Sequence, residues 1–275
     1  MALNLSLIGS TYNVPEFSYT HRDTILYALG IGANENDLDF LYEGKGPKVY
    51  PSFATVGSGM GGEKILNELN IDPFMIIHGG QKVKLHGPIP PAATVTTVAK
   101  VAGIYDKGKG ALVVLEFHSS IGGKLAFENE VTMFVRGAGG FGGERNPPGE
   151  AVVIPARAPD QEITIQTDPK QALVYRLSGD WNPLHADPAI AQMAGFARPI
   201  LHGLSTVGST TRMIQKTLCN DDPAGIKSIN VRFSTPVLPG DKLTGRLWVE
   251  GKKVFVQVVN EKGEVCLADC LFELN

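Results

Sequence analysis

The chain contains one segment twice, as Lys82-Val83-Lys84-Leu85-His86-Gly87-Pro88-Ile89-Pro90-Pro91 and as Asn230-Val231-Arg232-Phe233-Ser234-Thr235-Pro236-Val237-Leu238-Pro239. Both copies have an apolar, a basic and an apolar residue, then two residues, a proline, a β-branched residue, one further residue and a second proline. Their first residue numbers, 82 and 230, differ by 148. Because self-similarity at a fixed spacing marks a repeated structural unit, this pair indicates that one unit occurs twice.

Further matches keep the same order along the chain. They are Tyr27-Ala28-Leu29 with Tyr175-Arg176-Leu177, Asn34 with Asn182, and Thr55-Val56-Gly57-Ser58 with Thr206-Val207-Gly208-Ser209. The first two keep the spacing of 148 and the third has 151. Each half is therefore expected to begin with a helix-forming stretch and to continue through a Gly-containing helix into β-rich runs.

The β-rich runs carry β-branched and aromatic residues between Gly-containing turns. They are 94–101, 111–119 and 125–135 in the first half, and 242–249, 254–260 and 264–272 in the second. Turns such as Asp106-Lys107-Gly108 and Glu261-Lys262-Gly263 join neighbouring runs, which is typical of antiparallel hairpins. The sequence therefore predicts two α+β units.

Residues 137–149 separate the halves and consist mainly of glycine and proline, without periodic apolar residues. This composition predicts a linker rather than a helix or a strand. We therefore expect two domains, residues 1–155 and residues 156–275.

The composition is that of an ordinary globular protein, with 275 residues, 43% hydrophobic residues and a net charge of -3. Nucleic-acid binders usually carry a basic excess, so DNA and RNA are not expected as partners. The three cysteines, Cys219, Cys266 and Cys270, form no CxxC pair and indicate reduced thiols.

Targeting signals are weak in this sequence. Residues 1–14 lack a basic region followed by a long apolar stretch, so neither a signal peptide nor a membrane anchor is expected. The last four residues, Phe-Glu-Leu-Asn, differ from a Ser-Lys-Leu peroxisomal address. A cytoplasmic location is the expectation, with the peroxisome left open for a eukaryotic source.

Two patterns suggest cofactors and are set aside. The spacing GxGxxG occurs at Gly57, Gly59 and Gly62 and again at Gly137, Gly139 and Gly142. A dinucleotide site needs this pattern inside a parallel βαβ unit, which neither context predicts. Four residues could ligate a metal, but their spacing matches no familiar metal signature; they are Asp180, His185, Asp187 and His202. We expect no metal.

The segment 178–188 carries chemistry that only one copy has. Asp180 and His185 lie five residues apart in a stretch of turn-forming residues, and Gly32 and Asp37 stand at the equivalent positions. A feature found in one copy points to function rather than to the fold. Carboxylate and imidazole brought onto one water suit general acid and base work. The alternative is that Asp180 caps a helix and His185 packs in a pocket.

A possible oxyanion site follows at Gly203, which opens an apolar helical run. Free backbone N–H groups at a helix start stabilise an oxyanion, and glycine lets a substrate approach the backbone. An acid–base pair beside such a site indicates chemistry next to a carbonyl.

Segments 175–188 and 199–204 resemble the MaoC-like, hydratase 2 family, and the resemblance spans nearly the whole chain. It implies a double hot-dog fold, in which each half wraps a curved antiparallel sheet around a helix. It also implies that Asp180 and His185 activate a water that adds to a trans-2-enoyl-CoA, giving the (3R)-3-hydroxyacyl-CoA. Asn182 then helps to hold the water, and the Gly203 amide binds the thioester carbonyl.

By the same resemblance, the first half lacks catalytic residues and holds the acyl chain and part of the coenzyme A. The residues implied to contact the thioester ligand are His78, Gly79, Lys107, Tyr175 and Phe233. The family more often has an acidic residue where Gly80 stands, so the contacts of the ligand with the turn at residues 78–81 are less firmly implied. No separate cofactor is implied, since coenzyme A is part of the substrate, and a homodimer is expected.

Two other functions fit a hot-dog fold. One is a dehydratase or thioesterase acting on acyl-carrier-protein thioesters, which a single-copy hot dog would favour. The other is a catalytically inactive acyl-CoA binding module, against which the presence of Asp180, Asn182 and His185 argues.

Overall fold

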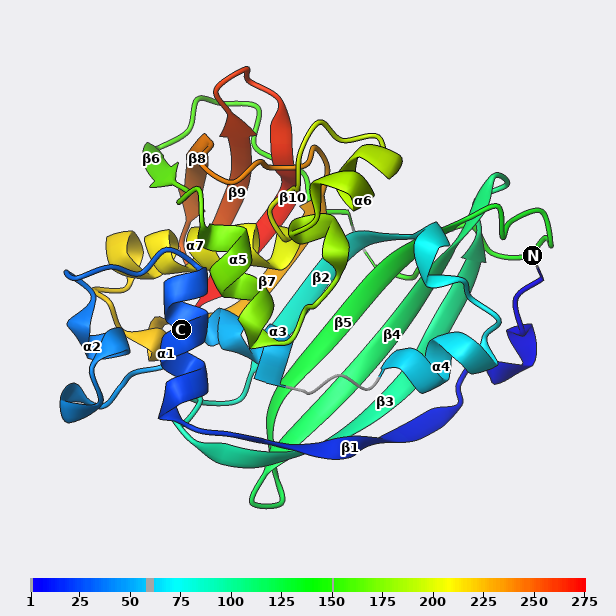
Figure 1. Ribbon diagram of the computed structural model, residues 1–275, viewed down its shortest axis with the longest axis horizontal. Helices are drawn as coiled ribbons and strands as arrows, with labels where there is room; N and C mark the ends of the chain where they lie inside the picture. The colour runs from blue at the N-terminus through cyan, green and yellow to red at the C-terminus, as the bar shows by residue number, and fades with distance from the viewer. Residues whose placement is uncertain (1, 58–61, 150) are drawn as a thin grey trace.

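The structure is a computed structural model that describes residues 2–57, 62–149 and 151–275. Ten strands form one continuous sheet in the order β1-β3-β4-β5-β2-β7-β10-β9-β8-β6 (Figure 1). The strands are β1 (Thr11–Tyr19), β2 (Ile76–Leu85), β3 (Ala93–Asp106), β4 (Gly110–Ile121), β5 (Lys124–Arg136), β6 (Gln161–Gln166), β7 (Ile226–Phe233), β8 (Lys242–Glu250), β9 (Lys253–Asn260) and β10 (Val265–Leu274). Every strand pairing recorded for these residues is antiparallel, which confirms the predicted hairpins.

The two halves of the sheet have the same strand order. The first runs β1-β3-β4-β5-β2 from its edge to the centre, and the second runs β6-β8-β9-β10-β7. They join where β2 pairs with β7, and there Lys82 lies opposite Asn230. These are the residues that the repeat aligns, so a local two-fold axis passes through this pair.

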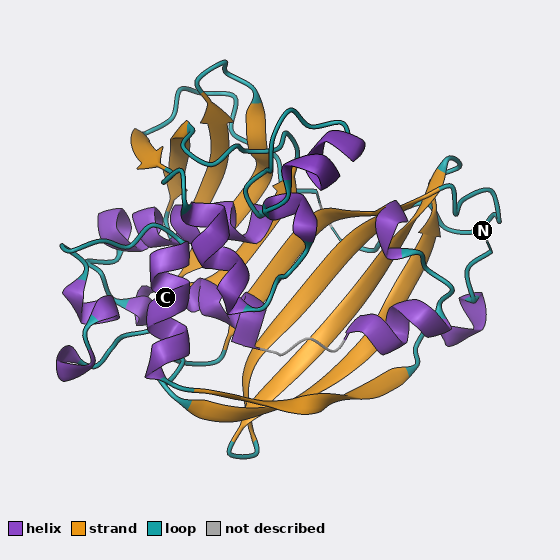
Figure 2. Ribbon diagram, viewed as in Figure 1, coloured by secondary structure: helices purple, strands orange, loops and turns teal. Residues whose placement is uncertain are grey.

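Seven α-helices are present in the described chain, and most of them gather on the concave side of the sheet (Figure 2). They are α1 (His21–Gly30), α2 (Leu38–Leu41), α3 (Ala54–Gly57), α4 (Gly62–Glu68), α5 (Gln171–Tyr175), α6 (Pro188–Met193) and α7 (Gly203–Leu218). Short 3-10 helices add η1 (Leu5–Leu7), η2 (Glu43–Lys45), η3 (Pro51–Phe53), η4 (Pro73–Met75), η5 (Arg176–Ser178), η6 (Pro183–His185) and η7 (Pro223–Gly225). None of the described helices is long and apolar enough to span a membrane.

Helix α7 is the Gly-containing helix predicted for the second half, and it buries small polar residues along much of its length. Gly208 permits close packing, because a Cβ there would overlap the side chain of Ile31. In the first half, α3 and α4 flank residues 58–61. Ser58 of the repeat and Gly59 of the first glycine pattern therefore lie outside the described residues.

Helices α1 and α5 bring equivalent residues of the two halves together. The rings of Tyr27 and Tyr175 have centroids 5.9 Å apart, and both side chains are buried. A Cβ at Gly30 would lie 2.9 Å from the Tyr175 Cα, so glycine allows the two helices to approach. The matched tyrosines therefore meet at the junction of the halves.

The glycine tract at 137–149 contains no helix or strand, as predicted for a linker. The carboxylate of Asp106 accepts hydrogen bonds from the backbone N–H groups of Gly108, Gly140 and Gly142 at 2.7, 2.9 and 2.6 Å. These hydrogen bonds lower the pKa of Asp106, and the bond from Gly140 has the largest effect. The amides that a dinucleotide phosphate would use thus bind a carboxylate of the β3–β4 hairpin.

Candidate active site

The loop between η5 and α6 holds the predicted pair in a hydrogen-bonded turn. The Asp180 Oδ1 accepts the Asn182 backbone N–H at 3.1 Å, and the Asn182 Oδ1 accepts the Leu184 N–H at 3.0 Å. The His185 N–H donates to the Asn182 carbonyl at 3.2 Å, closing the short helix η6. Short polar side chains that bond to the backbone two residues on favour such turns. The turn places Asp180 and His185 on the same side of the loop.

The tautomer and the charge state of the His185 imidazole follow from its surroundings. Its Nδ1 lies 2.9 Å from the carbonyl oxygen of Ile200, and because a carbonyl only accepts, Nδ1 carries the proton. The residue is 8% exposed, and burial lowers its pKa below the ordinary value. His185 is therefore a neutral imidazole near pH 7, with Nε2 bare and able to accept a proton.

Three groups converge at this place. Side-chain atoms of Asp180, His185 and His202 lie within 4.8 Å of one another, and the Asp180 side chain is 45% exposed. Asp180 caps neither nearby helix, since Asn182 caps η6 and Asp187 caps α6. A carboxylate open to solvent therefore faces a buried, neutral imidazole across a gap of the size that one water spans.

Helix α7 begins at Gly203, directly beside this group. The first N–H groups of a helix have no partner within the helix, so the Gly203 amide is available to an acceptor. A Cβ at this position would lie 2.8 Å from the ring of Phe233, whereas glycine leaves the backbone open. The geometry suits stabilisation of a carbonyl oxygen by the helix start.

Residues of the first half reach the same place through Phe233. The ring of His78 lies 4.7 Å from that of Phe233, and its Nε2 donates to the Gly80 carbonyl at 3.1 Å. Burial lowers the pKa of His78 to about 4. Gly79 lies in the bulge where the β2–β5 register shifts between His78 and Gly80. The predicted contacts at 78, 79, 203 and 233 are thus contiguous.

The other two predicted contacts differ from each other. The ring of Tyr175 lies 4.9 Å from that of His202, next to the Asp180–His185 pair. Lys107 lies in the β3–β4 turn, and its Nζ donates to the Oδ1 of Asn146 at 2.5 Å. No recorded contact of the described chain joins Lys107 to the Asp180 loop, so its assignment to the ligand stays a prediction.

His202 belongs to the site, although the sequence suggested it only as a metal ligand. His202 is 1% exposed, and its ring stacks on that of His185 with the ring centroids 3.7 Å apart. The comparison of the two copies could have found it, because at a spacing of 151 the first half has Pro51. Its Nε2 lies 3.3 Å from the Asp180 carbonyl, so that nitrogen carries a proton and offers no lone pair to a metal.

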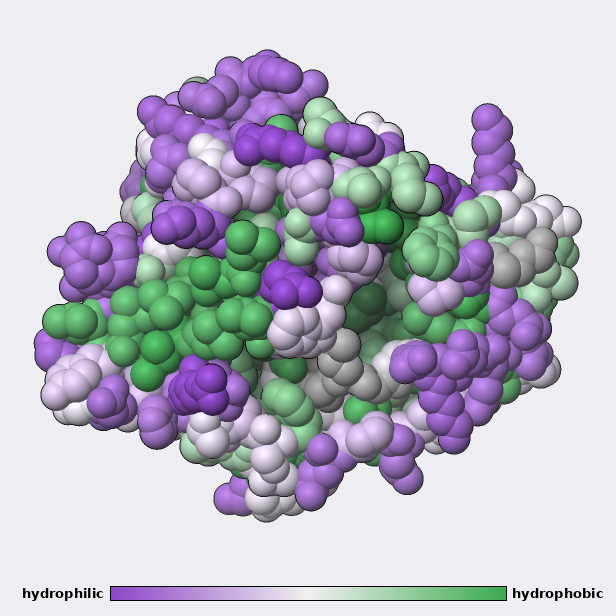
Figure 3. Space-filling view, viewed as in Figure 1, coloured by the Kyte–Doolittle hydropathy of each residue, from purple (hydrophilic) through white to green (hydrophobic). Residues whose placement is uncertain are grey.

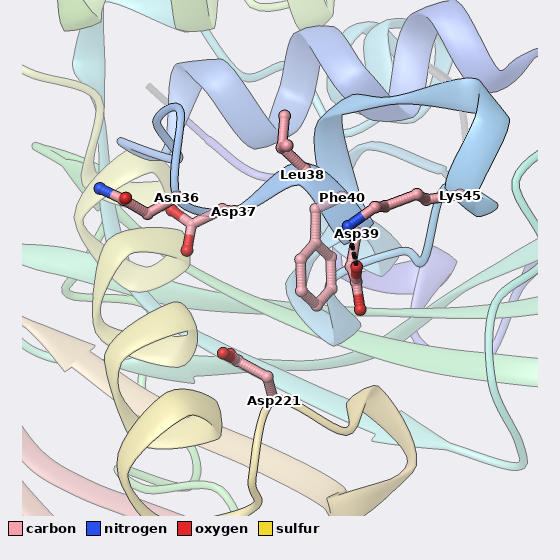
Figure 4. Close-up of a pocket in the computed structure, with 7 residues that line it drawn as sticks. All are labelled: Asn36, Asp37, Leu38, Asp39, Phe40, Lys45 and Asp221. Carbon is pink, nitrogen blue, oxygen red and sulfur yellow. Dashed lines mark ion pairs between the residues drawn. The ribbon is translucent and has the colours of Figure 1, made fainter.

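The equivalent place in the first half has no such pair. Asp37 stands where His185 does, with its side chain 2% exposed, and it pairs with Arg212 at 3.0 Å and Lys216 at 3.2 Å. Both cations lie on α7. A cavity of about 230 Å³ lies here. Figure 4 shows the residues that line it, which are Asn36, Asp37, Leu38, Asp39, Phe40, Lys45 and Asp221. The vacated position thus forms an ion-pair network.

A hollow lies beside the Asp180 loop on the face shown in Figure 3. It opens between the α6 segment and α4, over strands β4 and β5, and its visible floor is hydrophobic (Figures 1 and 3). An apolar hollow next to an acid–base pair is typical of a site for a ligand with a long apolar part.

Comparison with known proteins covers almost the whole chain. Residues 17–137 match the model of the MFE-2 hydratase 2 N-terminal domain, and residues 150–268 match the MaoC like domain. The "Enoyl-CoA hydratase 2, peroxisomal" of Arabidopsis thaliana is 41% identical over 94% of this chain and 91% of its own length. The "Peroxisomal multifunctional enzyme type 2" of Mus musculus is 38% identical over 96% of this chain, which corresponds to 38% of the mouse protein. The crystal structure of a MaoC-like dehydratase from Phytophthora capsici is 35% identical and superposes with a TM-score of 0.90, covering 99% of this chain and 98% of that one.

Proposed function

The chain belongs to the MaoC-like, hydratase 2 family, has its double hot-dog fold, and we infer from both that it hydrates enoyl-CoA to 3-hydroxyacyl-CoA in fatty-acid metabolism. The reaction is a reversible lyase reaction, so the same site dehydrates the hydroxyacyl thioester. The observation that carries the chemistry is the convergence of the Asp180 carboxylate with the imidazoles of His185 and His202, where His202 directly precedes Gly203 at the start of α7.

We propose that Asp180 and His185 hold one water between them, with Asn182 supporting the loop. The water oxygen bonds to C3 of the trans-2-enoyl group, and the water proton passes through the pair to C2 on the same face. His185 takes the proton from the water, because its Nδ1 proton is held by Ile200 and its Nε2 is free. The Gly203 amide stabilises the negative charge that develops on the thioester oxygen. The product is the (3R)-3-hydroxyacyl-CoA.

The first half holds the acyl chain in this proposal. The hollow over β4 and β5 supports it, because an apolar floor beside the reacting carbon suits an alkyl chain (Figure 3). His78, Gly79 and Phe233 border the thioester, and Tyr175 supports the site by packing on His202. Lys107 would meet coenzyme A only at a distance from the pair. No separate cofactor or metal takes part, so activity should survive dialysis against a chelator.

A homodimer is also proposed. Figure 3 shows a broad hydrophobic area over α1 and α5. Leu29 of α1, Leu173 of α5 and Leu177 of η5 have exposed side chains. Contiguous apolar surface of this kind marks protein contacts. Sedimentation should give twice the chain mass, and Leu177→Asp should give a monomer.

The cytoplasm remains the proposed compartment, although the Arabidopsis and mouse relatives are named peroxisomal.

The test is the loss of ultraviolet absorbance of a trans-2-enoyl-CoA, with chiral analysis of the product. Formation of the (3R) alcohol across short and long chains supports the proposal. Tight acyl-CoA binding without turnover would show a binding module instead. A strong preference for an acyl-carrier-protein thioester over the matching coenzyme A thioester would move the substrate to that carrier.

A further inference from the structure

Two segments of the site are tied together by a reciprocal pair of hydrogen bonds. His185, in the loop, donates its Nδ1–H to the Ile200 carbonyl at 2.9 Å. His202, two residues after Ile200, donates its Nε2–H back to the Asp180 carbonyl at 3.3 Å. Each segment therefore supplies one imidazole donor and one carbonyl acceptor to the other. The loop and the start of α7 are held in one relative position.

The ring of His202 contacts the rings of both His185 and Tyr175. Its centroid is 3.7 Å from that of His185, with the planes at 27°, and 4.9 Å from that of Tyr175. At 1% exposure, His202 is buried behind the pair and does not face the open side of the site. It is placed to hold the plane of the His185 ring rather than to contact substrate.

His202 is electrically neutral at working pH. Burial, followed by the like charge of His185, lowers its pKa to about 4. The charged or titratable groups around it are Asp180, His185 and Arg176, with Tyr175 packed against its ring. A neutral ring next to His185 adds no positive charge when His185 takes a proton during turnover.

From this geometry we infer that His202 is a positioning residue of the proposed hydratase, which braces the Asp180 backbone and the His185 ring so that both meet one water. It precedes Gly203, so the brace also fixes the distance between the pair and the carbonyl-binding amide. Because small misplacements of reacting groups cost rate rather than affinity, losing the brace should lower kcat more than it changes KM.

The matched variants are His202→Asn and His202→Gln. The amide nitrogen of glutamine stands at the same bond count as Nε2 and can donate to the Asp180 carbonyl, whereas that of asparagine is one bond short. We expect kcat to fall about 100-fold in His202→Asn and about tenfold or less in His202→Gln, with KM nearly unchanged in both. The acid limb of the kcat/KM profile should move to higher pH in His202→Asn only, because a looser loop admits water to His185.

A nuclear magnetic resonance titration of the His185 ring gives a readout that needs no turnover. The inference predicts an Nδ1–H tautomer for His185 in the wild type, and a raised pKa with partial loss of that tautomer in His202→Asn. Melting temperatures of the two variants check that both are folded. If His202→Asn keeps the wild-type kcat, acid limb and ring tautomer, the brace does not exist. An inactive wild type with these ring signals would instead refute the hydratase proposal alone.

Discussion

Two loops, residues 180–185 and residues 32–37, occupy equivalent places in the two halves and make the same turn. In the first loop, the Oδ1 of Asn182 accepts the backbone N–H of Leu184, and the carbonyl of Asn182 accepts the backbone N–H of His185. In the second, the Oδ1 and carbonyl of Asn34 accept from Asn36 and Asp37 in the same way, at 3.1 and 2.8 Å. The backbone turn is thus a property of the repeated unit.

The side chains on this shared turn serve different ends. His185 faces Asp180 across a gap that opens to solvent, whereas Asp37 is buried against Arg212 and Lys216 of α7. Helix α7 serves both loops, with its amino end at the site and its later turns at the ion pairs. One copy of the turn thus carries the candidate acid–base residues, and the other joins the first half to α7 of the second half.

The largest effect should come from the pair itself. Asp180→Asn and His185→Gln should each lower kcat by roughly 10² to 10⁴, the usual contribution of a positioned acid or base. Circular dichroism should show that both variants are folded, and the melting temperature should fall only in His185→Gln, which loses the Nδ1–H bond to the Ile200 carbonyl. Stopped assays on a trans-2-enoyl-CoA measure the change. Wild-type turnover in either variant would remove that residue from the mechanism.

Asp37→Asn is the corresponding change in the other loop. It leaves the largely buried Arg212 charge without its partner, so the free energy of unfolding should fall by about 3 kcal/mol. Urea denaturation measures this loss. The kcat per folded molecule should remain that of the wild type, and a drop in kcat without a drop in stability would mean that the loop has a catalytic role.

Gly203→Ala tests the amide at the start of α7. Its new methyl group would press on the ring of Phe233, so kcat/KM should fall about tenfold as the amide becomes less accessible. Ser52 occupies the equivalent position in the first half at a spacing of 151, and Ser52→Ala is the control. Equal kinetic losses in both variants would contradict a special role for Gly203.

Asn182→Ala and Asn34→Ala compare the turns directly. Each removes one side-chain bond to a backbone N–H, so each should cost about 1 kcal/mol of stability. Thermal unfolding of both variants measures the cost. Only Asn182→Ala should also slow the reaction, and an equal slowing by Asn34→Ala would show that turn stability alone explains the effect.

The dependence of stability on pH should also differ between the two loops. Burial lowers the pKa of His185 and takes that of His202 to about 4, from an unfolded value of about 6.5. Below pH 6.5 these two histidines are therefore protonated in the unfolded chain but remain neutral in the folded chain, and the free energy of unfolding declines as the pH falls towards 4. Unfolding at several pH values measures the slope. The slope should be shallower in His202→Gln and unchanged in Asn34→Ala.

Much of the fold could be predicted because its signals are local. The strands β3, β4 and β5 and their counterparts β8, β9 and β10 matched the predicted runs within a few residues, except that β3 continues to Asp106. Alternating β-branched residues and Gly-containing turns depend only on neighbours in sequence. Asp180 and His185 could be proposed because the repeat supplied an internal control for each position, and Gly203 because a glycine opens an apolar helical run.

The contacts that His202, Asp37 and Lys107 make could not be predicted in the same way. Ring stacking on His185, ion pairs between the loop at 37 and α7, and the bond from Lys107 to Asn146 all join residues far apart in the chain. Likewise, glycine spacing alone could not show that Asp106 binds the amides of the 137–149 tract.

The sequence by itself determined the duplication, the hairpins and the residue types of the acid–base pair, because each is set by periodicity or by chemical identity. Tertiary structure alone decided which imidazole nitrogen is free, which histidine stands behind the pair and which face of the sheet forms an apolar hollow. Those properties depend on burial and on hydrogen-bond partners that folding brings together over long sequence distances.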